Sequence, residues 1–92
     1  MKYRVYILLS LKNNSFYIGV TNNLTRRINQ HNRGKSKSTK SGIPWKLVYY
    51  EEFDNIKEAY KREGYIKSLK KRKFIEKLIL SPRSSTDRTL AF

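Results

Sequence analysis

The sequence contains no cysteine and no long apolar run. A chain without cysteine forms neither disulfides nor thiolate metal sites, which is typical of cytoplasmic proteins. A helix that crosses a membrane needs about 20 consecutive apolar residues, and the apolar runs of this chain are far shorter. The first ten residues also lack the uninterrupted apolar segment of a secretion signal. With 92 residues in all, we expect one cytoplasmic domain that does not enter a membrane.

Acidic residues are also scarce in this chain. Seven aspartates and glutamates stand against 21 lysines and arginines, and the formal net charge is +14 at pH 7. Such a charge attracts polyanions, namely DNA, RNA or an anionic membrane. A membrane is disfavoured because no helix pattern near a chain end combines a wide apolar face with a basic one. We therefore expect a nucleic acid partner, either DNA or RNA. The alternative is a basic protein that is merely soluble or associated with ribosomes.

The hydrophobic pattern predicts three strands and three helices. The strands are expected at residues 3–9, 15–20 and 45–53, and the helices at about 24–32, 55–69 and 70–80. The order β-β-α-β-α-α indicates an α+β fold, with a small three-stranded antiparallel sheet flanked by helices. Residues 1–80 form the predicted domain, and residues 81–92 are predicted to be a flexible C-terminal tail.

Two features of the connecting segments support these boundaries. Asparagine and aspartate favour helix N-caps, so Asn22 or Asn23 is expected to cap the first helix and Asp54 or Asn55 the second. Residues 33–44 are rich in glycine, serine and lysine, which predicts a mobile basic loop. A loop of this length in a compact domain is either disordered or functional.

The first two strands are expected to present two tyrosines on one face. A short even-numbered hairpin loop pairs even positions of the first strand with odd positions of the second. Tyr6, Tyr17 and Gly19 then share one face of the sheet. A tyrosine in a strand usually serves packing. Two phenols beside a glycine, which lets another group approach the backbone, favour a functional site.

Charged residues also occur where the helix pattern requires apolar ones. Leu24, Arg27, Ile28 and His31 follow helical spacing and define the face of the first helix that packs on the protein. The equivalent stripe of the second helix contains a glutamate at its centre and consists of Ile56, Ala59, Tyr60, Glu63, Ile66 and Lys67. Buried charge is costly unless it is paired or binds a ligand.

Two explanations of these charges are possible at this stage. One is a salt bridge between Arg27 and Glu63 that closes the core and has no function. The other is a cleft at the edge of the sheet, in which Arg27 and His31 meet an anion and Glu63 holds a cation.

The spacing of the tyrosine motifs resembles that of the GIY-YIG nuclease superfamily. "VYI" at 5–7 and "YIG" at 17–19 correspond to its two short motifs, with ten residues between Tyr6 and Tyr17. "TNNLTRRINQH" is similar to the first helix of that family, and "AYKREGYIKSL" to the helix that carries its metal-binding glutamate. The resemblance covers about residues 3–80. It is strongest to small stand-alone members, which are related to the N-terminal nuclease domain of the bacterial excision nuclease.

This resemblance implies an endonuclease that hydrolyses phosphodiester bonds with one divalent metal ion, and it favours DNA over RNA as the substrate. Glu63 would bind Mg²⁺ or Mn²⁺, hard cations that prefer oxygen ligands. Arg27 would bind the scissile phosphate, since a guanidinium matches the charge that develops on its oxygens. Tyr6 and Tyr17 would line the site, and one of them would aid deprotonation of the attacking water.

The resemblance also assigns roles to a histidine and a glycine. His31 would lie near the attacking water and is the favoured general base, because histidine titrates near neutral pH. Gly19 would keep the backbone close to the substrate.

The sequence departs from the family pattern at two places. Arg4 stands where the family name has glycine. The family usually has an asparagine after the glutamate, whereas no asparagine follows Asn55 in this chain. Either another residue such as Ser68 substitutes, or the contact is absent. The second case makes a catalytically weak or inactive nucleic-acid-binding module the alternative function.

Basic residues cluster at the junction of the last two helices. We expect them to contact the phosphate backbone, together with lysines of the basic loop. The residues predicted to bind substrate in this way are Lys67, Lys70, Lys71 and Arg72. No recognition helix, zinc finger or RNA-stacking motif is present to read bases. We therefore expect recognition of DNA structure, as in repair or recombination, and a protein partner that supplies targeting.

Overall fold

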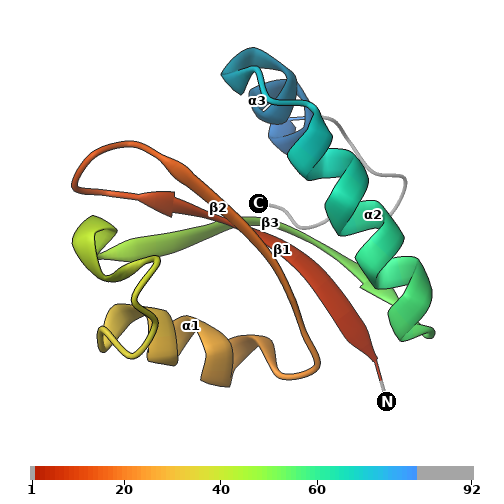
Figure 1. Ribbon diagram of the computed structural model, residues 1–92, viewed down its shortest axis with the longest axis horizontal. Coiled ribbons are helices and arrows are strands. Elements are labelled where there is room, and N and C mark those ends of the chain that lie inside the picture. The colour runs from red at the N-terminus through yellow and green to blue at the C-terminus, as the bar shows by residue number, and fades with distance from the viewer. Residues whose placement is uncertain (1, 81–92) are drawn as a thin grey trace.

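The protein, described here by a computed structural model, forms an α+β domain in which the structure describes residues 2–80 (Figure 1). Its strands are β1 (Tyr3–Ser10), β2 (Phe16–Thr21) and β3 (Trp45–Phe53). Its helices are α1 (Leu24–Asn32), the short 3₁₀ helix η1 (Lys40–Gly42), α2 (Ile56–Ser68) and α3 (Arg72–Leu80). The predicted fold class and element order are confirmed. The predicted tail at 81–92 lies outside the described residues.

The three strands form one antiparallel sheet in the order β2-β1-β3. In the register of β1 and β2, Tyr6 lies opposite Gly19 and Leu8 lies opposite Tyr17. Since side chains alternate along a strand, Tyr6, Tyr17 and Gly19 share one face of the sheet, as predicted. Helix α1 covers this face, whereas α2 and α3 cover the other (Figure 1).

The larger part of the core lies between the sheet and helices α2 and α3. Buried aliphatic side chains of the strands, such as Val5 and Ile7, pack there against Ala59 and Ile66 of α2 and Ile75 of α3. On the opposite face, Tyr6, Leu8 and Trp45 form a smaller cluster with partly buried residues of α1. Buried side chains therefore cover the centre of the sheet on both faces, and β1 is buried between the two layers of helices.

The inward face of α2 differs from the predicted stripe. Ala59 and Ile66 are buried, but Tyr60 is 55% exposed, and Ile56 is exposed as well. The side chain of Lys67 is also 55% exposed. The helix turns residues 59, 62, 63 and 66 toward the sheet instead, because Arg62 makes an ion pair with the buried Glu51 of β3 at 3.0 Å.

Asparagines cap the N-termini of α1 and α2, as the sequence predicts. The Asn23 side chain accepts a hydrogen bond from the backbone N–H of Arg26, and the Asn55 side chain accepts one from Lys57. These bonds satisfy donors at the first turn that have no partner within the helix. Within residues 2–80, no helix combines the length and apolarity that crossing a bilayer requires.

The segment at 33–44 is folded in its second half, contrary to the prediction of a mobile loop. Thr39 and Gly42 are buried. The backbone carbonyl of Thr39 accepts a hydrogen bond from Trp45 Nε1 at 2.7 Å, and that of Gly42 accepts one from Ser10 Oγ at 2.6 Å. The segment is held because these side chains satisfy its backbone carbonyls.

Candidate active site

Two tyrosines project from β1 and β2 toward α1. The ring centroids of Tyr6 and Tyr17 are 6.3 Å apart; Tyr6 is buried and Tyr17 is half-buried. A Cβ atom at Gly19 would lie 2.7 Å from the Tyr6 hydroxyl and 3.2 Å from the Tyr17 ring. Gly19 is itself buried. Its missing side chain therefore makes room for the two phenols.

His31 lies at the centre of this cluster and is fully buried. Its Nε2 atom is 3.0 Å from the Tyr6 hydroxyl oxygen, and its Nδ1 atom is 2.8 Å from Thr39 Oγ1. The Thr39 hydroxyl donates in turn to the carbonyl of Ser36. This network assigns the histidine proton to Nδ1, so that Nε2 accepts from the Tyr6 hydroxyl.

The environment of His31 differs from the one expected for a general base. Burial and the nearby charge of Arg27 lower the pKa of His31 to about 4. The imidazole is therefore neutral at pH 7, and both of its nitrogens are occupied by protein partners. Burial raises the pKa of Tyr6 to about 12, so this phenol is protonated at the same pH. His31 consequently holds Tyr6 through Nε2.

Arg27 lies on α1, half-buried beside the two phenols. Burial alone would lower the pKa of Arg27, but hydrogen bonding and charge interactions with Tyr6 and Tyr17 raise it overall. Its Nη1 atom donates to Gln30 Oε1 at 2.9 Å. The first helix therefore turns Arg27 and His31 toward the sheet, as the helical spacing predicts.

Glu63 comes from α2, which packs on the opposite face of the sheet. Its side chain is 18% exposed, and it pairs with Lys67 Nζ at 3.2 Å. Burial is the main cause of the raised pKa of Tyr6, and the charge of Glu63 is the last of the contributing causes. Among residues 2–80, Glu63 and Arg27 form no ion pair, so a salt bridge between them does not close the core.

Comparison with known proteins identifies the family of this chain. The sequence profile of the GIY-YIG catalytic domain matches residues 2–77. The chain belongs to the GIY-YIG family. Its fold also resembles the solution structure of the UPF0213 protein BH0048 from Bacillus halodurans, with a TM-score of 0.55, 38% identity and coverage of 86% of this chain and 83% of that one.

Small UPF0213 proteins are similar to this GIY-YIG chain over most of its length. One from Clostridium perfringens is 53% identical over 66 residues, which cover 71% of this chain and 70% of the relative. UPF0213 protein YazA of Bacillus subtilis is 39% identical over 69 residues, which cover 74% and 70% of the two chains. The predicted resemblance to small stand-alone members is therefore confirmed.

GIY-YIG nucleases generally use a divalent metal ion, and Glu63 offers a place for one. Residues 2–80 contain no group of three or more acidic, histidine or cysteine side chains that could surround a metal. Mg²⁺ is commonly bound by one or two carboxylates, with water and substrate phosphate completing the shell. The Lys67 partner of Glu63 is mostly exposed, and such surface pairs are weak. Glu63 therefore fits a site with a single protein ligand.

The predicted substrate-binding cations divide into two groups. Lys67 lies beside Glu63, and Lys70 and Lys71 are exposed between α2 and α3. Arg72 pairs with Glu76 at 3.0 Å, lies 4.3 Å above the Phe16 ring and donates to the Asn14 carbonyl. These contacts join α3 to the β1–β2 hairpin.

Sequence reasoning missed Thr39 as a partner of the site. Its hydroxyl is the acceptor that fixes the His31 tautomer, and nothing distinguishes this threonine from the serines around it in a basic loop. Ser68, the suggested substitute for the family's asparagine, is exposed and donates to the Tyr65 carbonyl of its own helix at 2.6 Å.

Proposed function

We propose that this protein is a metal-dependent endonuclease that hydrolyses phosphodiester bonds in DNA. The observation that carries the proposal is the position of the Arg27 guanidinium beside the Tyr6 and Tyr17 hydroxyls, in a family of nuclease domains. A guanidinium that lies close to two phenol hydroxyls can donate hydrogen bonds to an anionic substrate. The charge of the chain, +14, favours the same class of ligand.

The buried hydrogen bonds orient Arg27 for this task. The Thr39 hydroxyl fixes the proton of His31 on Nδ1, and Nε2 then accepts the Tyr6 proton. Because its proton points to His31, the Tyr6 oxygen interacts with Arg27 as an acceptor. His31 and Thr39 are thus positioning residues that act through Tyr6. A guanidinium held in this way loses little entropy when it binds a phosphate.

Hydrolysis itself requires water to attack phosphorus while the bond to the leaving oxygen breaks. Arg27 binds the non-bridging oxygens, where negative charge accumulates. Tyr17 reaches solvent, and we assign it the task of orienting the attacking water and aiding its deprotonation. Glu63 would hold Mg²⁺ or Mn²⁺, which supplies Lewis acidity and lowers the pKa of bound water. Residues 2–80 contain no recognition helix or zinc finger that reads bases, so we propose selection by DNA structure, as in repair or recombination, with targeting by a protein partner.

A nicking assay tests this function. Wild-type protein and the Glu63→Ala variant are incubated with supercoiled plasmid and a panel of branched DNAs, in Mg²⁺, Mn²⁺ or EDTA. We expect cutting that needs the metal and falls about 100-fold or more in Glu63→Ala. Glu58→Ala, which removes an exposed carboxylate from the same helix, is the matched control and should cut as wild type does.

The second candidate function is a binding module without catalysis. It is favoured by the missing asparagine downstream of Glu63 and by the single carboxylate at the site. DNA binding without cutting by the wild-type protein, on every substrate and with either metal, would support the module and reject the nuclease.

A further inference from the structure

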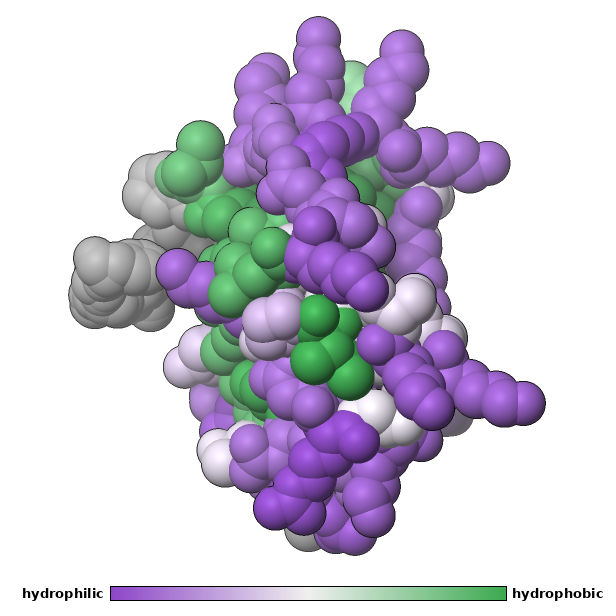
Figure 2. Space-filling model, turned by 90° about the vertical axis from the view of Figure 1, so that its left-hand side faces the viewer, coloured by the Kyte–Doolittle hydropathy of each residue, from purple (hydrophilic) through white to green (hydrophobic). Residues whose placement is uncertain are grey.

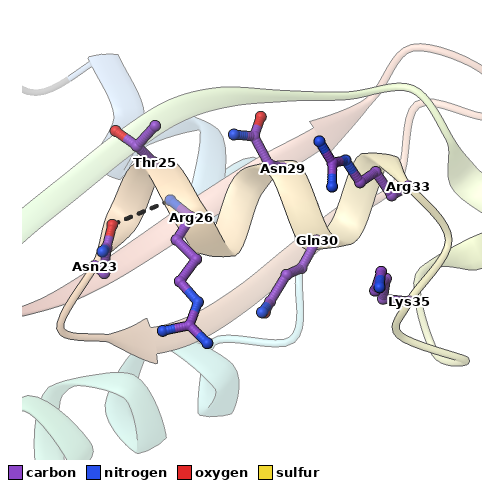
Figure 3. A pocket seen from close by; sticks show the side chains of 7 residues that line it. All are labelled: Asn23, Thr25, Arg26, Asn29, Gln30, Arg33 and Lys35. Carbon is purple, nitrogen blue, oxygen red and sulfur yellow. Dashed lines mark hydrogen bonds between the residues drawn. The ribbon is translucent and has the colours of Figure 1, made fainter.

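A second polar surface lies on the outer side of α1, away from the phenols. It is an open hollow of about 440 Å³ lined by Asn23, Thr25, Arg26, Asn29, Gln30, Arg33 and Lys35. Figure 3 shows these side chains along both sides of the helix, with Lys35 beyond its end. We call this surface the α1 groove.

The helical repeat explains the shape of the α1 groove. Residues four apart lie on one side of a helix, so Arg26 and Gln30 form one wall, while Thr25, Asn29 and Arg33 form the other (Figure 3). Arg26 and Arg33 are seven residues apart, which is about 10 Å along the axis. This span equals about three nucleotides of one DNA strand, at roughly 3.4 Å each.

The chemistry of the α1 groove selects an anion. All seven lining residues are polar, three are cations, and none is acidic. In the part of the chain that the structure describes, Arg26, Arg33 and Lys35 form no ion pair. The first 50 residues of the chain contain ten lysines and arginines and no aspartate or glutamate, so the potential around this surface is positive.

The α1 groove is joined to the candidate active site through one residue. Gln30 lines the groove, and its Oε1 atom accepts the hydrogen bond from Arg27 Nη1 at 2.9 Å. A strand whose phosphates follow the groove therefore reaches the guanidinium that we assign to the scissile phosphate. An isolated small anion would need only one cation, whereas the two rows of donors match a repeating backbone.

We propose that the α1 groove binds the phosphate backbone of the nucleic acid substrate and leads it to Arg27. The inference rests on the proposed function for its choice of partner. It assigns Arg26 and Arg33 to phosphate contact, in addition to the cations at the α2–α3 junction. Amide and guanidinium groups that contact the phosphate backbone of a nucleic acid do not distinguish its bases. Binding in the α1 groove is therefore independent of the nucleic acid sequence.

Binding measured without cutting tests the α1 groove separately from catalysis. Fluorescence anisotropy of a labelled DNA duplex is followed in EDTA at several salt concentrations, for wild type and for Arg26→Ala/Arg33→Ala. We expect the double variant to bind about tenfold more weakly at low salt. The slope of log K against log salt should fall by roughly 0.9 for each phosphate contact removed, or about 1.8 for the pair.

The control removes the same charge from another face of the protein. Lys57 and Lys61 are exposed on α2, on the other side of the sheet, and Lys57→Ala/Lys61→Ala should keep the wild-type slope. Arg26→Lys/Arg33→Lys keeps both charges and should retain most of the slope, which separates lost contacts from lost folding. Circular dichroism checks the fold of each variant.

The outcomes separate the groove from the nuclease. Loss of affinity in the α1 groove variant alone supports the groove, even in a protein that never cuts DNA. An unchanged slope in that variant overturns the groove, whether or not metal-dependent cutting is seen. A wild-type protein that binds no duplex, or that prefers an acidic peptide of equal charge, also overturns it.

Discussion

His31 shows how burial changes what a residue can do. It is the only histidine of the chain and has no exposed surface. An unburied histidine has a pKa of about 6.5, which suits a base at neutral pH. In this fold the pKa is lowered to about 4, and the imidazole serves as a neutral link between Tyr6 and Thr39.

The lowered pKa of His31 predicts a loss of stability in mild acid. Because the pKa is about 4 in the folded chain and about 6.5 when unfolded, the unfolded state binds more protons between these values. The free energy of unfolding therefore falls as pH decreases through this window, by roughly 2 kcal/mol between pH 7 and pH 5. Urea unfolding at both pH values measures the change.

A histidine NMR titration is the direct check on this prediction. With one histidine in the chain, the signal needs no assignment between residues. His31→Gln should flatten the pH dependence between pH 7 and pH 5, because glutamine does not titrate. A midpoint near 6.5 in the folded protein would contradict the buried neutral imidazole.

At the scale of elements, a buried ion pair sets the rotation of α2. Glu51 of β3 is only 6% exposed and accepts hydrogen bonds from Arg62 and from Tyr49. Arg62 directly precedes Glu63 in α2. The pair that fixes Arg62 against the sheet therefore also fixes the direction of the candidate metal ligand.

Removing Arg62 should destabilise the fold more than removing its neighbour. Arg62→Ala takes the ion-pair partner from a buried carboxylate, and we expect the free energy of unfolding to fall by about 2–4 kcal/mol. Lys61→Ala removes an exposed charge one residue away and should change it by less than about 0.5 kcal/mol. Urea unfolding compares the two variants, and equal effects would reject the role of the pair.

The predictability of each element followed from the kind of signal it carried. The alternation in residues 3–9 and the asparagine caps are local, and they predicted the strands, the first helix and the shared face of Tyr6 and Tyr17. The rotation of α2 depends on Glu51, a partner distant in sequence, so helical spacing alone turned Tyr60 inward incorrectly.

The burial of His31 could not be predicted for a similar reason. Its neutral state depends on Thr39 and on a loop that Trp45 and Ser10 hold in place. The composition of that loop indicated mobility, since serine, glycine and lysine say nothing about which backbone carbonyls find partners. The helix and strand spacing predicted which side chains point toward the sheet or share one of its faces. It did not predict the role of each residue.

At the scale of the whole molecule, positive charge is distributed over separate surfaces. Figure 2 shows hydrophilic side chains at the height of α3 and again at the height of α1, with apolar side chains between them. The α2–α3 junction and the α1 groove therefore lie on different parts of the surface. A strand that touched both would have to pass across the hairpin end of the molecule or bend.

This charge predicts opposite effects of salt on folding and on binding. With a net charge of +14, like charges repel in the folded chain. The ion pairs of Lys2 and Arg4 are surface pairs that contribute little. Screening should therefore raise the free energy of unfolding between 20 and 200 mM NaCl, by on the order of 1 kcal/mol. Over the same range DNA binding should weaken, because the release of counterions from DNA becomes less favourable as the salt concentration rises.

Urea unfolding and anisotropy in matched buffers measure the two effects together. The Lys57→Ala/Lys61→Ala variant, which carries two fewer charges, should show a smaller stabilisation by salt and the same decrease in DNA affinity. A wild-type protein that salt destabilises would mean that attractive pairs outweigh repulsion in the fold. That result would reject repulsion between like charges as the main effect of salt on the stability of this fold.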